Sequence, residues 1–234
     1  MLTLALMNLN NPMLWAILIG WILSVTIHEF SHGLAAHLGG DYTIAERGGL
    51  TLNPLQYIDP LGSLVFPAII FLIGGIPLPG GATYVRDDLL RGRGWRVAMS
   101  AAGPFSNFIM YLILCLLLSP GVGWVQEGLP VQQWTQAQLW VGALAVLQIL
   151  SVVLNLLPIP PLDGFHMISP FLPEHVQEKL NSPGIRSLCY FGYFMLLTGA
   201  PLFWYFIYHT VFQIHGGLGF NPDVFQAWNR AMYD

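Results

Sequence analysis

The sequence predicts an all-α integral membrane protein: a polytopic bundle of four transmembrane helices, with a re-entrant or fifth apolar segment and a short extended element. Three observations predict this class. Hydrophobic residues make up 55% of the 234 residues, and only 9% are charged, against about 25% in an average soluble domain. Several stretches are long and apolar enough to cross a bilayer. The few basic residues gather between particular stretches. We expect a single membrane-embedded domain over residues 1–234.

The same composition excludes other classes. A soluble globule or a disordered chain needs more charged and polar residues than this sequence has. A formal net charge of -4 without a sizeable basic patch excludes nucleic acid as a partner. Cys115 and Cys189 both lie in apolar stretches, where we expect packing residues rather than a disulfide.

A helix needs about 20 mostly apolar residues to cross a bilayer. Four stretches meet this requirement, and they are residues 13–38, 97–118, 139–157 and 188–212. A fifth stretch, residues 61–76, is shorter and is interrupted by Pro67. This length favours a re-entrant segment, and a fifth crossing is the alternative.

The basic residues favour the re-entrant alternative. If residues 61–76 do not cross, seven of the eight Lys and Arg residues lie on one side, and only Arg230 lies on the other. The 119–138 loop on that other side contains neither Lys nor Arg. By the positive-inside rule, the basic side is cytoplasmic and both termini are outside. A crossing by residues 61–76 would instead separate Arg47 from the arginines at 86–96.

Three shorter segments complete the predicted organisation. Residues 48–54 alternate and contain turn-forming residues, which indicates a short extended piece near the membrane surface. Residues 77–81 read as a turn. Residues 215–234 are polar enough for a surface helix or loop.

The first predicted span contains the pattern His28-Glu29-Phe30-Ser31-His32. On a helix, positions i and i+4 share one face, so His28 and His32 are placed to bind one metal ion. Glu29 projects about 100° away, from where its carboxylate can take a proton from a metal-bound water. A carboxylate inside a membrane costs about 2.5–3.5 kcal/mol on insertion scales, which makes a functional role the default.

A catalytic zinc site uses three protein ligands and one open position. Asp163 is the strongest candidate for the third ligand, because it follows the inner end of the third span, where Pro158, Pro160 and Pro161 stop the helix. The alternative is that Asp163 and Gly164 only form a turn. The remaining histidines fit less well. We expect His37 to face elsewhere, His209 to be a buried hydrogen-bonded or substrate-channel residue, and His166, His175 and His215 to be solvated.

Four motifs resemble those of the site-2 protease family of intramembrane zinc metallopeptidases, peptidase family M50. They are HEFSH, LTLNPLQYIDPLG (residues 50–62), AAGPFSN (101–107) and NLLPIPPLDG (155–164), in the order typical of the family. The chain resembles short bacterial members that lack PDZ and CBS domains. It departs from them at Tyr57, where relatives often have His, and at Phe165 and His166 after the Asp-Gly pair.

The resemblance implies that His28, His32 and Asp163 bind Zn²⁺ and that Glu29 is the general base. It implies hydrolysis of peptide bonds within or near transmembrane segments of substrate proteins. We expect this to occur in the lipid bilayer of a bacterial inner membrane, with the active site toward the cytoplasmic side indicated by the basic residues. Asn155 and Asn107 would stabilise the oxyanion or hold a substrate strand; an interhelical hydrogen bond is the alternative for each.

Two non-proteolytic hypotheses compete with this one. A pseudoprotease that only binds membrane helices would be expected to have lost Glu29 or a ligand, and neither is lost. A metal transporter usually shows repeated halves with polar residues in several spans. These spans contain almost none.

Overall fold

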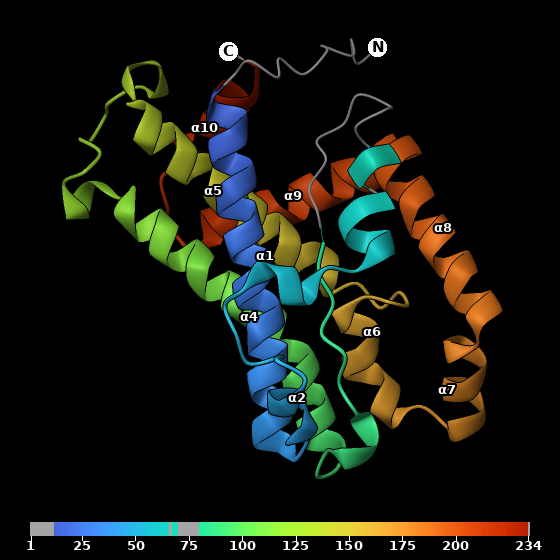
Figure 1. Cartoon of the computed structure of the whole chain (residues 1–234). Coiled ribbons are helices and arrows are strands. Elements are labelled where there is room, and N and C mark those ends of the chain that lie inside the picture. Colours follow the sequence, from blue (N-terminus) through green and yellow to red (C-terminus); the bar gives the residue numbers. More distant parts are fainter. Residues whose placement is uncertain (1–11, 66, 70–79, 234) are drawn as a thin grey trace.

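The computed structural model describes residues 12–65, 67–69 and 80–233, and it assigns helices and no strand within them (Figure 1). Three of the helices are long and apolar enough to cross a membrane: α1 (Pro12–Gly39), α4 (Arg93–Leu117) and α5 (Gln136–Asn155). They coincide closely with the first three predicted spans. The all-helical class and the membrane-spanning character expected from the sequence are therefore confirmed.

Local sequence explains where α5 begins and ends. Thr135 caps its first turn by accepting a hydrogen bond from the Gln138 N–H, and the Gln138 side chain accepts one from the Thr135 N–H. This reciprocal pair satisfies two N–H groups that a helix start leaves open. The helix ends at Asn155, three residues before Pro158, whose ring would clash with the helix and which has no N–H to donate.

The prediction of one continuous span over residues 188–212 is wrong. Two helices occupy this part of the chain, α8 (Pro183–Gly199) and α9 (Pro201–Gly217), and they meet at an angle of 82°. The break lies at Ala200, between a glycine that weakens the end of α8 and a proline that cannot continue an α8 hydrogen-bond ladder. Hydropathy alone does not reveal this bend, because both halves are apolar.

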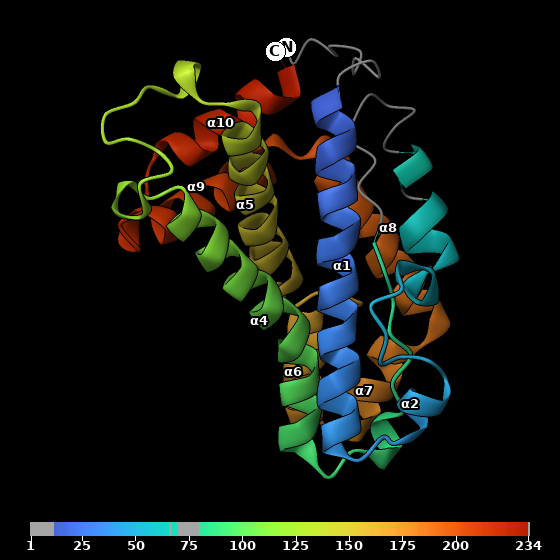
Figure 2. The same ribbon diagram turned by 60° about the vertical axis from the view of Figure 1, so that its left-hand side comes forward.

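The described residues between α1 and α4 include four short helical elements. They are α2 (Thr43–Glu46), η1 (Pro54–Tyr57), the π-helical η2 (Pro60–Val65) and η3 (Asp87–Leu89). No strand is assigned at residues 48–54. Half of residues 61–76 and most of residues 77–81 lie outside the described residues. The extended stretch is residues 80–86, which runs beside α1 in both views (Figures 1 and 2).

Asp41 joins the end of α1 to this segment. Its carboxylate is fully buried, accepts hydrogen bonds from Thr43 and from the Arg86 N–H, and pairs with Arg47 at 3.2 Å. Burial alone would raise the pKa of Asp41, but these hydrogen bonds and the Arg47 charge lower it below its ordinary value. The contacts hold α2 and residue 86 against the α1 terminus.

The core lies around α5, which packs between α1, α4 and α9 and against α10 (Asp223–Tyr233). The predicted helix near the C-terminus is thus present, but one face of it, including Val224, Ala227 and Trp228, is buried instead of lying on the surface. The start of α1 lies at the same end of the bundle as α10. The end of α1, the start of α4, and α7 (Glu174–Asn181) lie at the opposite end (Figures 1 and 2).

Candidate metal centre

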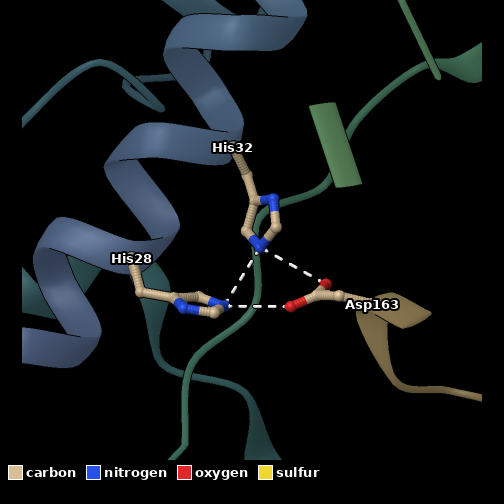
Figure 3. Close-up of side chains that lie close together, drawn as sticks. All are labelled: His28, His32 and Asp163. Carbon is tan, nitrogen blue, oxygen red and sulfur yellow. Dashed lines mark hydrogen bonds and ion pairs between the residues drawn. The ribbon is translucent and has the colours of Figure 1, made fainter. Parts of the chain in front are cut away.

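Two imidazoles meet on one face of α1. His28 and His32 lie one helical turn apart, and their Nε2 atoms are 3.1 Å from each other (Figure 3). Both residues are buried, with 7% and 6% of their surface exposed. The four-residue spacing of the two histidines therefore brings both Nε2 atoms close enough to bind the same metal ion.

Asp163 completes the cluster from another part of the chain. It is the first residue of α6 (Asp163–Ile168), and its two carboxylate oxygens lie 3.2 Å from His28 Nε2 and 3.3 Å from His32 Nε2 (Figure 3). The chain reaches this position by folding tightly back onto the end of α5. A Cβ at residue 164 would lie 2.2 Å from the Leu156 carbonyl oxygen, so the fold requires the glycine found there.

The second nitrogen of each imidazole is held by α4. His28 Nδ1 donates a hydrogen bond to Asn107 Oδ1 at 3.2 Å, and His32 Nδ1 donates one to the Met99 carbonyl oxygen at 2.7 Å. Because a carbonyl oxygen only accepts, each Nδ1 carries a proton, so Nε2 is the nitrogen of each ring that can offer a lone pair to a metal ion. Two lone pairs and a carboxylate then converge, an arrangement that a cation between them would stabilise.

The dimensions of the cluster fit a small metal ion. Metal–ligand bonds of about 2.0–2.2 Å in tetrahedral geometry place neighbouring ligand atoms about 3.3–3.6 Å apart, and small movements of the side chains reach this range. The three measured separations are 3.1, 3.2 and 3.3 Å. Within the described part of the chain, Asp163 Oδ2 is also buried without a hydrogen-bond partner. The donor set of two imidazoles and one carboxylate suits zinc.

Gly103 leaves the room that these ligands need. A Cβ at this position would lie 2.3 Å from His32 Nε2 and 2.5 Å from His28 Nε2. Met99, Gly103 and Asn107 are spaced four residues apart on α4, so they form one stripe along the helix that faces α1. The Met99 carbonyl was not among the predicted site groups, although its four-residue spacing from Gly103, just before the AAGPFSN motif, indicates it.

Glu29 lies beside the cluster on α1 and is buried, with 7% of its surface exposed. Its backbone carbonyl accepts a hydrogen bond from Thr83 Oγ1, and a Cβ on Gly81 would lie 2.9 Å from its Cγ. The extended stretch of residues 80–86 therefore packs directly against Glu29. Among the described residues, no group donates a hydrogen bond to the Glu29 carboxylate, which leaves it available as a base.

The two asparagines differ in their contacts. Both ends of the Asn107 amide are engaged, because Oδ1 accepts from His28 and Nδ2 donates to Ser151 Oγ at 2.7 Å. These two contacts favour an interhelical hydrogen-bonding role for Asn107 over a role in binding the oxyanion or the substrate. Asn155 Nδ2 donates to the same Ser151 Oγ at 3.2 Å, one turn earlier on its own helix. Ser151 thus connects both asparagines, a link the sequence analysis missed.

The other histidines lie outside the cluster. His37 packs against the Tyr42 ring, and His175 is exposed as expected. His209 is also exposed, so the expectation of a buried, hydrogen-bonded side chain at this position is wrong. Solvated side chains were expected for His166, His175 and His215, and this expectation is wrong for His166 and His215. His215 is 1% exposed and bonds to Tyr111 and the Asn221 carbonyl oxygen. His166 is half-buried in α6, and this burial lowers the pKa of its imidazole.

Comparison with known proteins decides the family. The model of peptidase family M50 matches residues 122–199. A relative from Mycolicibacterium smegmatis, named "putative zinc metalloprotease Rip2", is 36% identical over 194 residues, which cover 81% of this chain and 70% of the relative. This chain belongs to peptidase family M50, the site-2 protease family. No solved structure matches this M50 chain.

Two further relatives of this M50 chain cover similar shares. The protein of the same name from Mycobacterium tuberculosis is 34% identical over 207 residues, 86% of this chain and 74% of the relative. "Putative zinc metalloprotease YwhC" from Bacillus subtilis is 32% identical over 188 residues, 77% of this chain and 78% of the relative. The part matched by the M50 model contains α5 and Asp163, whereas His28, Glu29 and His32 lie before it.

Proposed function

We propose that this M50 chain is a zinc endopeptidase that hydrolyses peptide bonds within or near transmembrane segments of other proteins. The observation that carries the proposal is the convergence of His28, His32 and Asp163 beside Glu29, within a bundle of membrane-spanning helices. The names of the relatives support zinc as the metal and proteolysis as the chemistry.

Each residue has a distinct role in this proposal. His28, His32 and Asp163 would hold the ion, which when bound polarises a peptide carbonyl and brings the pKa of water toward about 7. The Glu29 carboxylate takes the proton of the attacking water and passes it to the nitrogen of the leaving amine. Asn107 and the Met99 carbonyl keep both imidazoles in the tautomer that the site requires.

The extended stretch 80–86 supports a way of presenting the substrate. A helical substrate hides its carbonyls in its own hydrogen bonds and must unwind before cleavage. The Gly80 and Ala82 N–H groups bond to Gly62 and Tyr57, whereas those of Gly81 and Thr83 have no partner in the described part of the chain. This unpaired edge can add an unwound strand beside Glu29.

The proposed placement in the membrane counts the bent α8–α9 pair as one crossing, which gives four crossings in a single domain. Most of the basic residues lie at the end of the bundle where α1 ends: Arg47, the arginines before α4, and Lys179. Arg230 lies on α10, at the other end. The positive-inside rule then puts the metal-binding half of α1 toward the cytoplasm, in the inner membrane of a bacterium.

Replacing Glu29 by Gln tests the function. The Glu29→Gln variant should bind about one zinc per chain like the wild type, because position 29 provides no ligand, and it should lose proteolysis because the amide is not a base. The measurement compares membrane proteins and their fragments in cells that express either form, together with the zinc content of each purified protein. Glu46→Gln, at an exposed position of α2, is the matched control.

The outcomes separate a protease from a pseudoprotease. A protease accumulates at least one uncleaved membrane protein in the Glu29→Gln cells and not in the Glu46→Gln cells. Identical fragment patterns in all three strains, with zinc bound, would favour the non-catalytic helix-binding protein. The intact Glu29 and the complete ligand set support the enzyme.

A further inference from the structure

A cavity of about 280 Å³ lies between α1 and the loop that carries η1 and η2. One wall is formed by Ile22, Val25 and Thr26 of α1, and the opposite wall includes Leu55 and Ile58. Its volume is slightly below the range of pockets that hold whole small molecules, about 300–1,000 Å³. It suits one large side chain rather than an entire cofactor.

The cavity adjoins the proposed general base. Ile22, Val25 and Glu29 are spaced by three and four residues, so they share one face of α1. Gly81 lies at the boundary, because a Cβ there would come within 2.9 Å of both Glu29 Cγ and Val25 Cγ1. The cavity therefore begins next to Glu29 and extends along α1 toward the start of that helix, past Val25 and Ile22.

The walls offer almost no free polar group to an occupant. The three side-chain hydroxyls that line the cavity all donate within the protein: Thr26 to the Ile22 carbonyl oxygen, Tyr57 to that of Thr51, and Ser63 to that of Gly80. No Asp, Glu, Lys, Arg or His is among the described residues that line it. An apolar side chain fits such walls, and a charged or amide side chain would lose its hydration without compensation.

We propose that this cavity is a specificity subsite that takes a large apolar side chain of the substrate, such as Leu, Met or Phe, next to the cleaved bond. The inference rests on the proposed proteolytic function. A strand paired with the Gly81–Thr83 edge runs alongside α1, and its alternate side chains point to one side. One of them then enters the cavity while its neighbouring carbonyl faces the metal-binding residues.

The test uses binding rather than cleavage, because the natural substrates are not identified. The probes are three peptide hydroxamates that differ only in the side chain next to the zinc-binding group: methyl, isobutyl or carboxymethyl. Their dissociation constants are measured by calorimetry on the zinc-loaded full-length protein in detergent micelles. The isobutyl compound should bind about tenfold or more tightly than the methyl compound, and the carboxymethyl compound should bind weakest.

Variants locate the preference in the cavity. Thr26→Phe fills the cavity from α1, and Ile58→Phe fills it from the opposite wall. Either one should reduce the isobutyl preference to about threefold or less. Leu23→Phe places the same phenylalanine side chain on α1 at an exposed position outside the cavity and should keep the preference. A zinc content equal to the wild type shows that each variant keeps the metal site.

Each contrary result has a distinct meaning. Equal binding of the methyl and isobutyl compounds to wild type, or an unchanged preference in both filled variants, overturns the subsite and leaves the protease intact. A preference that vanishes when phospholipid bilayers replace the micelles assigns the cavity to a lipid chain and also overturns the subsite. If no hydroxamate binds in a zinc-dependent manner, the proposed function fails and the subsite fails with it.

Discussion

Single side chains of α4 determine how the imidazoles of α1 are aimed. Asn107 Oδ1 fixes the tautomer of His28, and it is fixed in turn by the bond from its amide nitrogen to Ser151. Removing such an orienting partner typically lowers metal affinity about 10–100-fold. We therefore expect Asn107→Ala to weaken zinc binding by that factor, measured by competition with a chelator of known affinity.

Asn155→Ala is the control for that substitution. Asn155 shares the Ser151 hydroxyl with Asn107 but has no bond to His28. Its loss should change zinc affinity about threefold or less, within the scatter expected for an indirect contact. Equal losses in both variants would mean that the serine network, and not the Asn107–His28 bond, holds the site.

Gly103 gives a second prediction about a single residue. A methyl group at position 103 would collide with both Nε2 atoms, so Gly103→Ala should displace the ligands and abolish zinc binding. Gly94→Ala is the matched control, because it lies on the same helix with nothing within 4 Å of the added Cβ. It should retain zinc and, since alanine favours helices, lose no stability. Metal content after dialysis reports both outcomes, and a zinc-loaded Gly103→Ala protein would contradict the placement of α4.

A buried polar pair links α1 to α5. Gln148 Nε2 donates to Ser24 Oγ at 2.6 Å, while Gln148 Oε1 is buried without a partner among the described residues. Ser24→Ala removes the acceptor and leaves the whole amide unpaired, so it should cost about 0.5–2 kcal/mol. The double variant Ser24→Ala with Gln148→Leu removes both polar groups and should recover most of that loss. Unfolding in detergent micelles measures both, and a double variant less stable than the single one would argue against the pair.

The elements differ in how well the sequence predicts them. α1, α4 and α5 are each a single apolar run with clear ends, so composition locates them. The angle between α8 and α9 depends on how α9 packs across α5, which no local pattern records. The residues of the candidate site also differ in how well the sequence predicts their positions. The spacing of His28 and His32 follows from helix geometry alone. The residues themselves leave Asp163 open between a ligand and a turn, and only the fold shows that its carboxylate lies 3.2 Å from His28.

Contacts between helices were the features that the sequence predicted least well. The bond between His28 and Asn107 spans 79 positions, and its existence depends on how α4 crosses α1. His215 was misjudged for the same reason: it belongs to the end of a helix that folds back on Tyr111, and not to a loop in solvent.

At the scale of the whole molecule, the metal should stabilise the fold. Its proposed ligands lie on α1 and α6, and the groups that orient the imidazoles lie on α4, so one bound ion would connect three helices. Ligand linkage predicts a gain of about 4 kcal/mol when free zinc is 1,000 times the dissociation constant. The melting temperature in micelles should therefore fall on chelation and recover with added zinc. His28→Ala should melt independently of zinc, whereas His175→Ala, at an exposed site, should behave as the wild type.

The central position of α5 has a consequence for how the protein is made. Two of the helices that cover it, α9 and α10, lie last in the chain, so a growing polypeptide inserts α5 well before these neighbours exist. Its faces toward them are apolar, and lipid can cover those faces in the meantime. Its polar side chain at Gln148 instead points to α1, which is already in place. The order of synthesis thus matches the order in which the membrane-embedded groups need their partners.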